Sequence, residues 1–235
     1  MIERFSVQKD LDRGLETDSE LHIGQRKKMV KELEKRNIYN SRVLDSIMSV
    51  PRHIFIAQGL RHLAYQDRPL PIASGQTISQ PSTVALQSHL LGNITGKKVL
   101  EIGTGCGYQT AVLARMGAIV YSIERHKDLC RIANGNLKKL GYSNITLCWG
   151  DGYKGIPKIS PFYAILVTCG AESVPQSLLM QLEIGGKMVI PVGELHKEQE
   201  MFVITRKSET EFERLTMGKC SFVPMLEGVV DNNNY

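Results

Sequence analysis

The sequence predicts a doubly wound α/β fold with a mainly parallel sheet, antiparallel strands at one edge and a helical N-terminal extension. Between residues 97 and 193, short runs that are apolar almost throughout alternate with segments of helical period. Strands that are apolar on both sides belong to a sheet covered by helices on both faces, where parallel sheets occur. Beyond residue 200, apolar and polar residues alternate in a way that predicts antiparallel strands at the edge of this sheet.

The N-terminal part precedes the sheet and is expected to be helical. Residues 23–48 show two amphipathic helical periods with a break near residues 37–41. The first 22 residues carry no comparable pattern. We therefore divide the chain into an extension (1–22) and one domain (23–235), which has a helical portion (23–96) and an α/β core with the C-terminal strands (97–235).

The core elements follow one another with short connections, as a doubly wound sheet requires. Expected parallel strands cover 98–103, 118–124, 145–149, 162–168 and 187–193, and expected helices cover 108–117, 129–140 and 174–182. Expected antiparallel strands cover 201–207, 211–217 and 220–226.

Composition limits the class of protein. A chain of 235 residues with 42% hydrophobic residues is long enough for one sizeable core. Its net charge of +5 is mild, and no basic stripe predicts a nucleic-acid partner. The first ten residues are too charged for a signal peptide, and no apolar run approaches the roughly 20 residues that span a bilayer, so a cytoplasmic protein is expected.

The metal-ligating residue types are scattered. The five cysteines form no Cys-x-x-Cys pair, and the six histidines show no ligand-like spacing. We therefore expect free thiols in a reducing compartment and no metal site.

A glycine-rich turn follows the first core strand, in "LEIGTGCGYQT" (100–110). Gly103 and Gly105 allow a tight turn and a close approach of the backbone to a ligand. A dinucleotide fingerprint has a small residue where this chain has Tyr108. Glu101 would repel a phosphate and suits the ammonium of a methionine-like group, although an acid at a strand end can also be structural.

Two further strand ends carry acids. Glu124 follows the glycines by about 20 residues, the spacing of an acid that binds both ribose hydroxyls. Asp151 and Gly152 follow the third strand, where a carboxylate can accept from an adenine amino group, although Asp-Gly is also a common turn pair. Together the three strand ends indicate S-adenosylmethionine as the cofactor.

Four segments carry a resemblance to a known family: "LPIASGQTISQPSTVA", "VLEIGTGCGYQTAVLA", "GDGYKG" and "LEIGGKMVIPVG". They resemble protein-L-isoaspartate (D-aspartate) O-methyltransferases over about residues 50–226. The resemblance implies methylation of the α-carboxylate of isoaspartyl residues in damaged proteins and peptides. The ester then closes to a succinimide, whose hydrolysis returns some normal aspartate. By this resemblance Ser79 is the active-site residue.

The chemistry agrees with a hydroxyl-rich segment at this point. A carboxylate is ionised at neutral pH and needs no base, so an enzyme has to orient and desolvate it. Ser79 is expected to hold the substrate carboxylate, with Thr77 and Ile78 beside it at the cofactor. Alternatively, Ser79 or Ser82 only caps the following helix, with Pro81 in its first turn.

Three other functions fit this sequence less well. A DNA amino-methyltransferase would need an Asn/Asp-Pro-Pro-aromatic motif where this chain has "TCGA" (168–171), and an NAD oxidoreductase is disfavoured by Tyr108 and Glu101. A binding module that has lost its activity is the third alternative.

The family usually has Asp where this chain has Tyr163. We expect a monomer with no nucleic-acid or membrane partner, while the preferred damaged proteins and the extent of D-aspartyl activity stay open.

Overall fold

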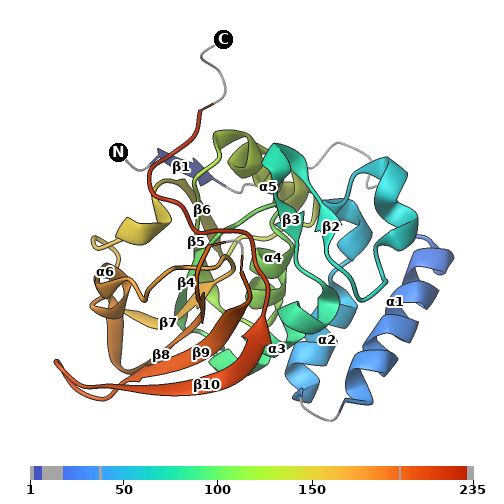
Figure 1. Cartoon of the computed structure of the whole chain (residues 1–235). Helices are drawn as coiled ribbons and strands as arrows, with labels where there is room; N and C mark the ends of the chain where they lie inside the picture. The colour runs from blue at the N-terminus through green and yellow to red at the C-terminus, as the bar shows by residue number, and fades with distance from the viewer. Residues whose placement is uncertain (1–2, 7–17, 37–38, 196, 232–235) are drawn as a thin grey trace.

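The computed structural model describes residues 3–6, 18–36, 39–195 and 197–231. Its centre is an eight-stranded sheet in the order β1-β6-β5-β4-β7-β8-β9-β10 (Figure 1). Strands β4 to β8 pair in parallel and β9 and β10 pair antiparallel at one edge, which confirms the predicted fold class. The strands are β1 (Glu3–Ser6), β4 (Lys98–Ile102), β5 (Ile119–Glu124), β6 (Ile145–Trp149), β7 (Phe162–Val167), β8 (Leu182–Val192), β9 (Gln199–Arg206) and β10 (Phe212–Cys220).

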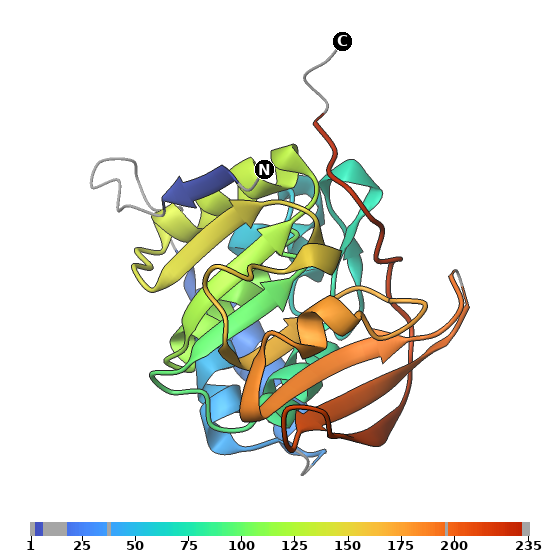
Figure 2. The same ribbon diagram turned by 90° about the vertical axis from the view of Figure 1, so that its left-hand side faces the viewer.

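Helices cover both faces of the sheet, with the larger group on one side (Figure 2). Alternate residues of β4 belong to two separate cores: Val99 packs in the core with α1 to α5, and Leu100 packs in the core with α6. The helices are α1 (Glu20–Glu34), α2 (Ser41–Ser49), α3 (Pro81–Leu91), α4 (Tyr108–Arg115), α5 (Lys127–Lys139) and α6 (Gln176–Leu179). Short 3₁₀ helices η1 (Arg52–Phe55), η2 (Gln58–Leu63), η3 (Ala73–Gly75) and η4 (Gly152–Lys154) and a small hairpin of β2 (Leu70–Pro71) and β3 (Thr77–Ile78) complete the fold.

The two N-terminal helices begin where polar side chains satisfy their first amides. Ser19 accepts from the backbone N–H of His22 at the start of α1, and Asn40 accepts from the N–H of Val43 at the start of α2. Side chains of this type replace hydrogen bonds that the first turn of a helix lacks. The predicted pair of helices with a break between them is thus confirmed.

The first residues differ from the sequence expectation. The sequence shows no strand pattern there, yet β1 pairs antiparallel with β6, with Glu3 opposite Trp149. Four residues are too few for a periodic signal, and their pairing depends on a strand far along the chain. Part of the predicted extension therefore belongs to the sheet.

Two predictions near the C-terminus were wrong. The strand expected over 220–226 does not form. Instead this segment lies against the loop after β7, where the Met225 N–H donates to the Gly170 carbonyl at 2.7 Å. The helix expected over 174–182 is only the four residues of α6, because Leu182 already begins β8 opposite Phe162. In both cases a long-range pairing overrides the local pattern.

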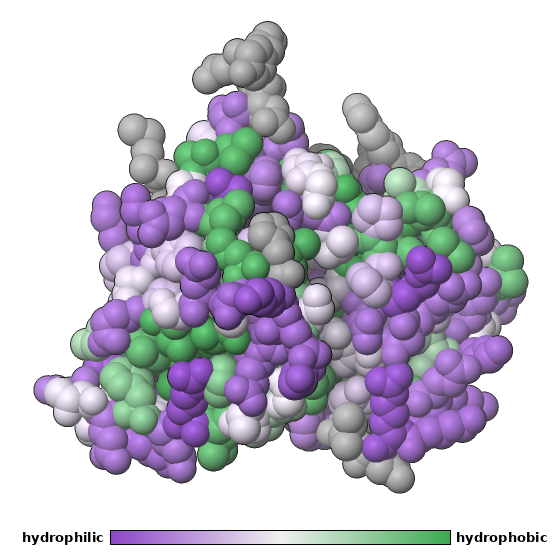
Figure 3. All heavy atoms as spheres, viewed as in Figure 1, coloured by the Kyte–Doolittle hydropathy of each residue, from purple (hydrophilic) through white to green (hydrophobic). Residues whose placement is uncertain are grey.

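The topology fixes where a ligand can bind. The chain winds outward from β4 to β5 and β6 on one side and to β7 and β8 on the other, so the order reverses between β4 and β7. Ligands of doubly wound sheets bind outside the carboxyl ends of the strands at this reversal. No helix in the described parts of the chain has the length and apolar character to cross a bilayer, and polar residues are spread between apolar patches on the face seen in Figure 3.

Candidate active site

A pocket lies at the carboxyl ends of β4, β5 and β7, where the topology places a ligand. The empty space inside it, counted together with its open mouth, is about 930 Å³. The lining residues are 76–79, 84, 102–106, 108–109, 123–126, 152, 168–169 and 223–226. The predicted site residues Thr77, Ile78, Ser79, Gly103, Gly105, Glu124 and Gly152 are among them, whereas Glu101 and Asp151 are not.

The glycine loop turns sharply at Gly103, which has a φ of +96°. A Cβ at this position would collide with the side chain of Thr168. The Thr168 hydroxyl lies 3.0 Å from the Ile102 carbonyl and 2.7 Å from the Gly103 carbonyl, so it holds the ends of β4 and β7 together. Only glycine fits this turn, and its backbone faces the pocket without a side chain in the way.

Glu124 joins two loops at the pocket. One carboxylate oxygen accepts from the Gly105 N–H at 2.9 Å and the other accepts from the His126 N–H at 3.0 Å. The side chain is 5% exposed and lines the pocket. A carboxylate offers about four acceptor positions, so this one keeps lone pairs for the two hydroxyls of a ribose.

Glu101 lies behind the glycine loop and is fully buried. Its Oε2 accepts from Thr110 at 2.5 Å and from Ser122 at 2.6 Å, while Oε1 has no hydrogen-bond partner among the described residues. Burial raises the pKa of Glu101 to about 7, against the two hydroxyls, which lower it. The predicted contact with an ammonium group would need a path to this carboxylate, so it stays a prediction.

Asp151 also stands back from the pocket. Its Oδ1 accepts from the Tyr153 N–H at 3.0 Å and thereby caps η4, in agreement with the turn alternative. Gly152 next to it does line the pocket, and a Cβ there would meet Ile102 at 2.5 Å. The adenine contact proposed for Asp151 stays a prediction.

Ser79 is half-buried and directly follows β3. The next helix, α3, begins at Pro81 with Gln80 at its cap and no side-chain hydrogen bond at that cap. The Ser82 hydroxyl accepts from Gln80 and the Ser82 N–H donates to Asp67 at 2.8 Å. Helix capping by a serine therefore does not account for Ser79, whose side chain is left to face the pocket.

Sequence reasoning missed one wall of the pocket, the segment Val223–Leu226. It also missed His126, which lines the pocket and whose Nδ1 is buried without a partner among the described residues. Further along the same C-terminal segment, the backbone of Val230 bridges to His126 and its carbonyl accepts from the Lys127 N–H. No local motif signals a C-terminal segment that crosses the pocket.

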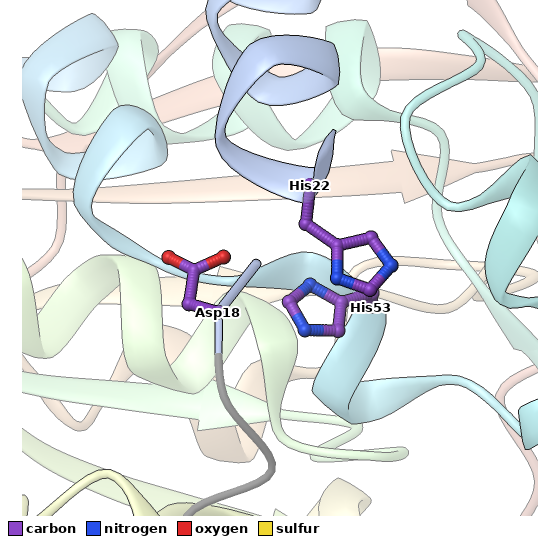
Figure 4. Close-up of side chains that lie close together, drawn as sticks. All are labelled: Asp18, His22 and His53. Atoms are coloured by element: carbon purple, nitrogen blue, oxygen red, sulfur yellow. The ribbon is translucent and has the colours of Figure 1, made fainter. Parts of the chain in front are cut away.

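Three possible metal ligands lie close together away from the pocket: Asp18, His22 and His53 (Figure 4). The two imidazole rings stack with centroids 3.8 Å apart and planes 18° apart, so their lone pairs lie in nearly parallel planes and do not converge on one point. Arg26 already donates to both oxygens of Asp18, and the Tyr65 hydroxyl lies 2.8 Å from His53 Nδ1. We assign no metal to this cluster, which sequence spacing had not revealed.

Comparisons with known proteins agree with this geometry. A family model described as protein-L-isoaspartate(D-aspartate) O-methyltransferase matches residues 24–230. Curated protein-L-isoaspartate O-methyltransferases of Flavobacterium psychrophilum and Christiangramia forsetii are each 50% identical over 210 residues, 89% of this chain and 98% of theirs.

Solved structures of similar fold also carry isoaspartate methyltransferase names. A protein-L-isoaspartate O-methyltransferase has a TM-score of 0.77 at 31% identity, covering 85% of this chain and 65% of that one. A β-aspartate methyltransferase of Plasmodium falciparum, solved in complex with S-adenosyl-L-homocysteine, has a TM-score of 0.75 at 27% identity, covering 86% of this chain and 98% of that one.

The doubly wound sheet, its glycine loop and the acid at the end of β5 define the class of S-adenosylmethionine-dependent methyltransferases. Within that class, the chain belongs to the protein-L-isoaspartate(D-aspartate) O-methyltransferase family. It is an enzyme of protein repair that methylates isoaspartyl residues.

Proposed function

We propose that the pocket between β3 and the glycine loop performs this methyl transfer, with Ser79 orienting the isoaspartyl carboxylate. The observation that carries the proposal is that Thr77, Ile78 and Ser79 line the same pocket as Gly103 and the Glu124 carboxylate. The segment with the hydroxyl and the cofactor loops, separated in sequence, thus face one space.

The residues present fit the cofactor. Gly103 and Gly105 bring bare backbone to the pocket, and Glu124 keeps free lone pairs for ribose hydroxyls. Ile123 and Met225 give apolar surface on which a purine can pack. When bound, S-adenosylmethionine supplies a methyl group on a sulfonium, a strong electrophile.

The protein's part in the reaction is to orient and desolvate the substrate. The carboxylate is already ionised, so no side chain has to remove a proton. The Ser79 hydroxyl donates a hydrogen bond that points one oxygen along the line of attack, and Thr77 and Ile78 close over the cofactor beside it. Excluding water strengthens the attraction between the anionic oxygen and the cationic donor.

A labelling experiment tests the proposal. Labelled S-adenosylmethionine is given with paired peptides that contain isoaspartate or normal aspartate at one position, and base-labile label is expected on the isoaspartyl peptide alone. Ser79→Ala is expected to lower kcat by about 100-fold, because one orienting hydrogen bond in a dry site has that value. Thr83→Ala, on the following helix and outside the pocket, is the matched control. Full activity in Ser79→Ala would rule out the role given to Ser79.

Three finer points complete the proposal. The enzyme acts as a monomer in the cytoplasm and takes D-aspartyl sites as a second substrate. The five cysteines, all unpaired in the structure, agree with a reducing compartment. Light scattering on a sizing column tests the monomer, since a dimer would elute with twice the mass. A D-aspartyl peptide in the same labelling assay tests the second substrate.

A further inference from the structure

One buried cation near the pocket forms no ion pair with any residue that the structure describes. Arg52, in η1, has no exposed surface, and its Nε donates to the Ala64 carbonyl at 2.9 Å. Both terminal nitrogens, Nη1 and Nη2, are buried without a hydrogen-bond partner among the described residues. A guanidinium keeps its proton in proteins. The carboxylate that acts on this charge from a distance, Asp67, already forms an ion pair with Arg36 at 2.5 Å.

This charge lies directly behind the pocket wall. The guanidinium carbon of Arg52 is 4.7 Å from the ring centroid of Tyr108, and Tyr108 lines the pocket. The Tyr108 hydroxyl is also buried without a partner among the described residues, as is Oε1 of Gln109. Two neighbouring residues that line the pocket, Tyr108 and Gln109, thus each have an unsatisfied polar atom.

The aromatic ring does not replace an anion. A ring face attracts a cation, but it supplies no acceptor in line with the N–H groups and leaves the charge in place. Burying a guanidinium without a counter-charge is unfavourable, and natural proteins pair such groups. The chain follows this rule elsewhere: Arg26 is 5% exposed and donates to both oxygens of Asp18.

We infer that Arg52 is the buried counter-charge for a carboxylate bound in the pocket. It is a positioning residue, because it acts through the wall formed by Cys106 and Tyr108 and does not itself line the pocket. The inference rests on the proposed use of this pocket. Two carboxylates can meet the description: that of the isoaspartyl substrate and that of the amino-acid end of the cofactor.

The two sources have different consequences. A substrate carboxylate loses its charge as the ester forms, so Arg52 would strengthen binding of the substrate and favour release of the product, without raising kcat. A cofactor carboxylate keeps its charge throughout, so Arg52 would strengthen binding of both the donor and its demethylated product. For two unit charges, a separation of roughly 10 Å at an effective dielectric of about 20 corresponds to an interaction of the size that changes affinity by about tenfold.

The test compares Arg52→Met with Arg52→Lys, and uses Arg26→Met as the control for loss of a buried arginine. Calorimetry gives the Kd of S-adenosylhomocysteine and of 5′-methylthioadenosine, the same nucleoside thioether without an amino-acid carboxylate. Kinetics give KM and kcat for an isoaspartyl peptide. We expect R52M to show one of two losses, each about tenfold, and R52K to recover most of it.

A rise in the Kd of S-adenosylhomocysteine but not of methylthioadenosine identifies the cofactor carboxylate. A rise in peptide KM at constant kcat identifies the substrate carboxylate. If R52M and R26M are destabilised alike and both leave Kd and KM within twofold of wild type, Arg52 is only structural and the inference fails.

A measurement on the wild-type protein guards against a variant that does not fold. A ¹³C-labelled carboxyl group on bound S-adenosylhomocysteine, or on an isoaspartyl peptide in the complex, is titrated by NMR. One of them is expected to titrate at lower pH than when free, and two unshifted carboxyls would overturn the inference. Failure of the proposed function would look different, since wild type would then leave the isoaspartyl peptide unlabelled whatever Arg52 does to binding.

Discussion

The backbone N–H of Gly105 donates a 2.9 Å hydrogen bond to Oε2 of Glu124, which ties the glycine loop after β4 to the end of β5. The second oxygen of the same carboxylate accepts from the His126 N–H at 3.0 Å. Glu124 is thus both a cofactor ligand in the proposal and the brace between two loops of the pocket. A change at Glu124 should affect binding more strongly than overall stability, because these loops lie at the rim of the sheet.

Glu124→Gln tests this double role. The amide keeps one acceptor and the size of the side chain, but it loses the charge that strengthens hydrogen bonds to the Gly105 N–H and to the ribose. We expect the Kd of S-adenosylhomocysteine, measured by calorimetry, to rise roughly 10- to 100-fold, since charge-assisted hydrogen bonds contribute about 1.5–3 kcal/mol. Glu209→Gln, at an exposed carboxylate, should bind like wild type. An unchanged Kd in E124Q would contradict the ribose assignment.

Gly103→Ala tests the glycine turn. At a φ of +96° an alanine is strained, and its Cβ would push the Thr168 side chain off the carbonyls at the ends of β4. We expect a loss of unfolding free energy of roughly 1–3 kcal/mol and a larger loss of cofactor binding, measured by urea unfolding and calorimetry. Gly24→Ala is the control: this exposed glycine of α1 has free space around it, so alanine should stabilise the helix by about 0.5–1 kcal/mol. Equal effects of the two substitutions would contradict the argument.

Glu101 predicts a dependence of stability on pH. Its pKa in the folded protein is raised from 4.5 to about 7 by burial, so the folded state holds a proton that the unfolded state has already released. The resulting stability is fully present below pH 4.5 and is lost as the pH rises from 4.5 through 7, by at most about 3 kcal/mol. Glu101→Gln removes this titration. Between pH 5 and pH 8, the free energy of unfolding of the variant should therefore rise relative to that of wild type.

Urea unfolding at pH 5 and pH 8 measures the difference in unfolding free energy between E101Q and wild type. Glu34→Gln, an exposed acid on α1, is the control and should keep the wild-type difference between the two pH values. A gap between E101Q and wild type that does not change with pH would show that Glu101 is ionised in the folded protein at both.

The sheet could be predicted from the sequence because each parallel strand is short, apolar on both faces and bounded by turn residues. The elements that the sequence did not reveal lack such a local signal. Strand β1 is defined only by its pairing with β6, and the segment after Cys220 is held by Gly170, which lies far along the chain. Helix α6 was overestimated because the strand beginning at Leu182 competes for the same residues.

The same distinction applies to the site. Glycines and the acid at the end of β5 stand at fixed places along one connection, so spacing alone locates them. Spacing does not tell which strand-end acid faces the ligand: Glu101 points under the loop to Thr110 and Ser122, whereas Glu124 faces the pocket. Arg52 has no motif at all, since its importance depends on what surrounds it in the folded chain.

His53 gives a second pH prediction, opposite in sign to that of Glu101. Burial, followed by the stacked ring of His22, lowers its pKa from 6.5 to about 4, so the folded state disfavours a proton that the unfolded state accepts. Stability is fully present above pH 6.5 and is lost as the pH falls toward 4, by at most about 3 kcal/mol. His53→Gln is therefore expected to flatten the loss between pH 6.5 and 4.5. Glu101 gains stability over the same pH range, so the free energy of unfolding is best measured in the Glu101→Gln background. The exposed His62→Gln variant is the control. If stability falls equally with pH in both histidine variants, His53 is protonated in the folded state.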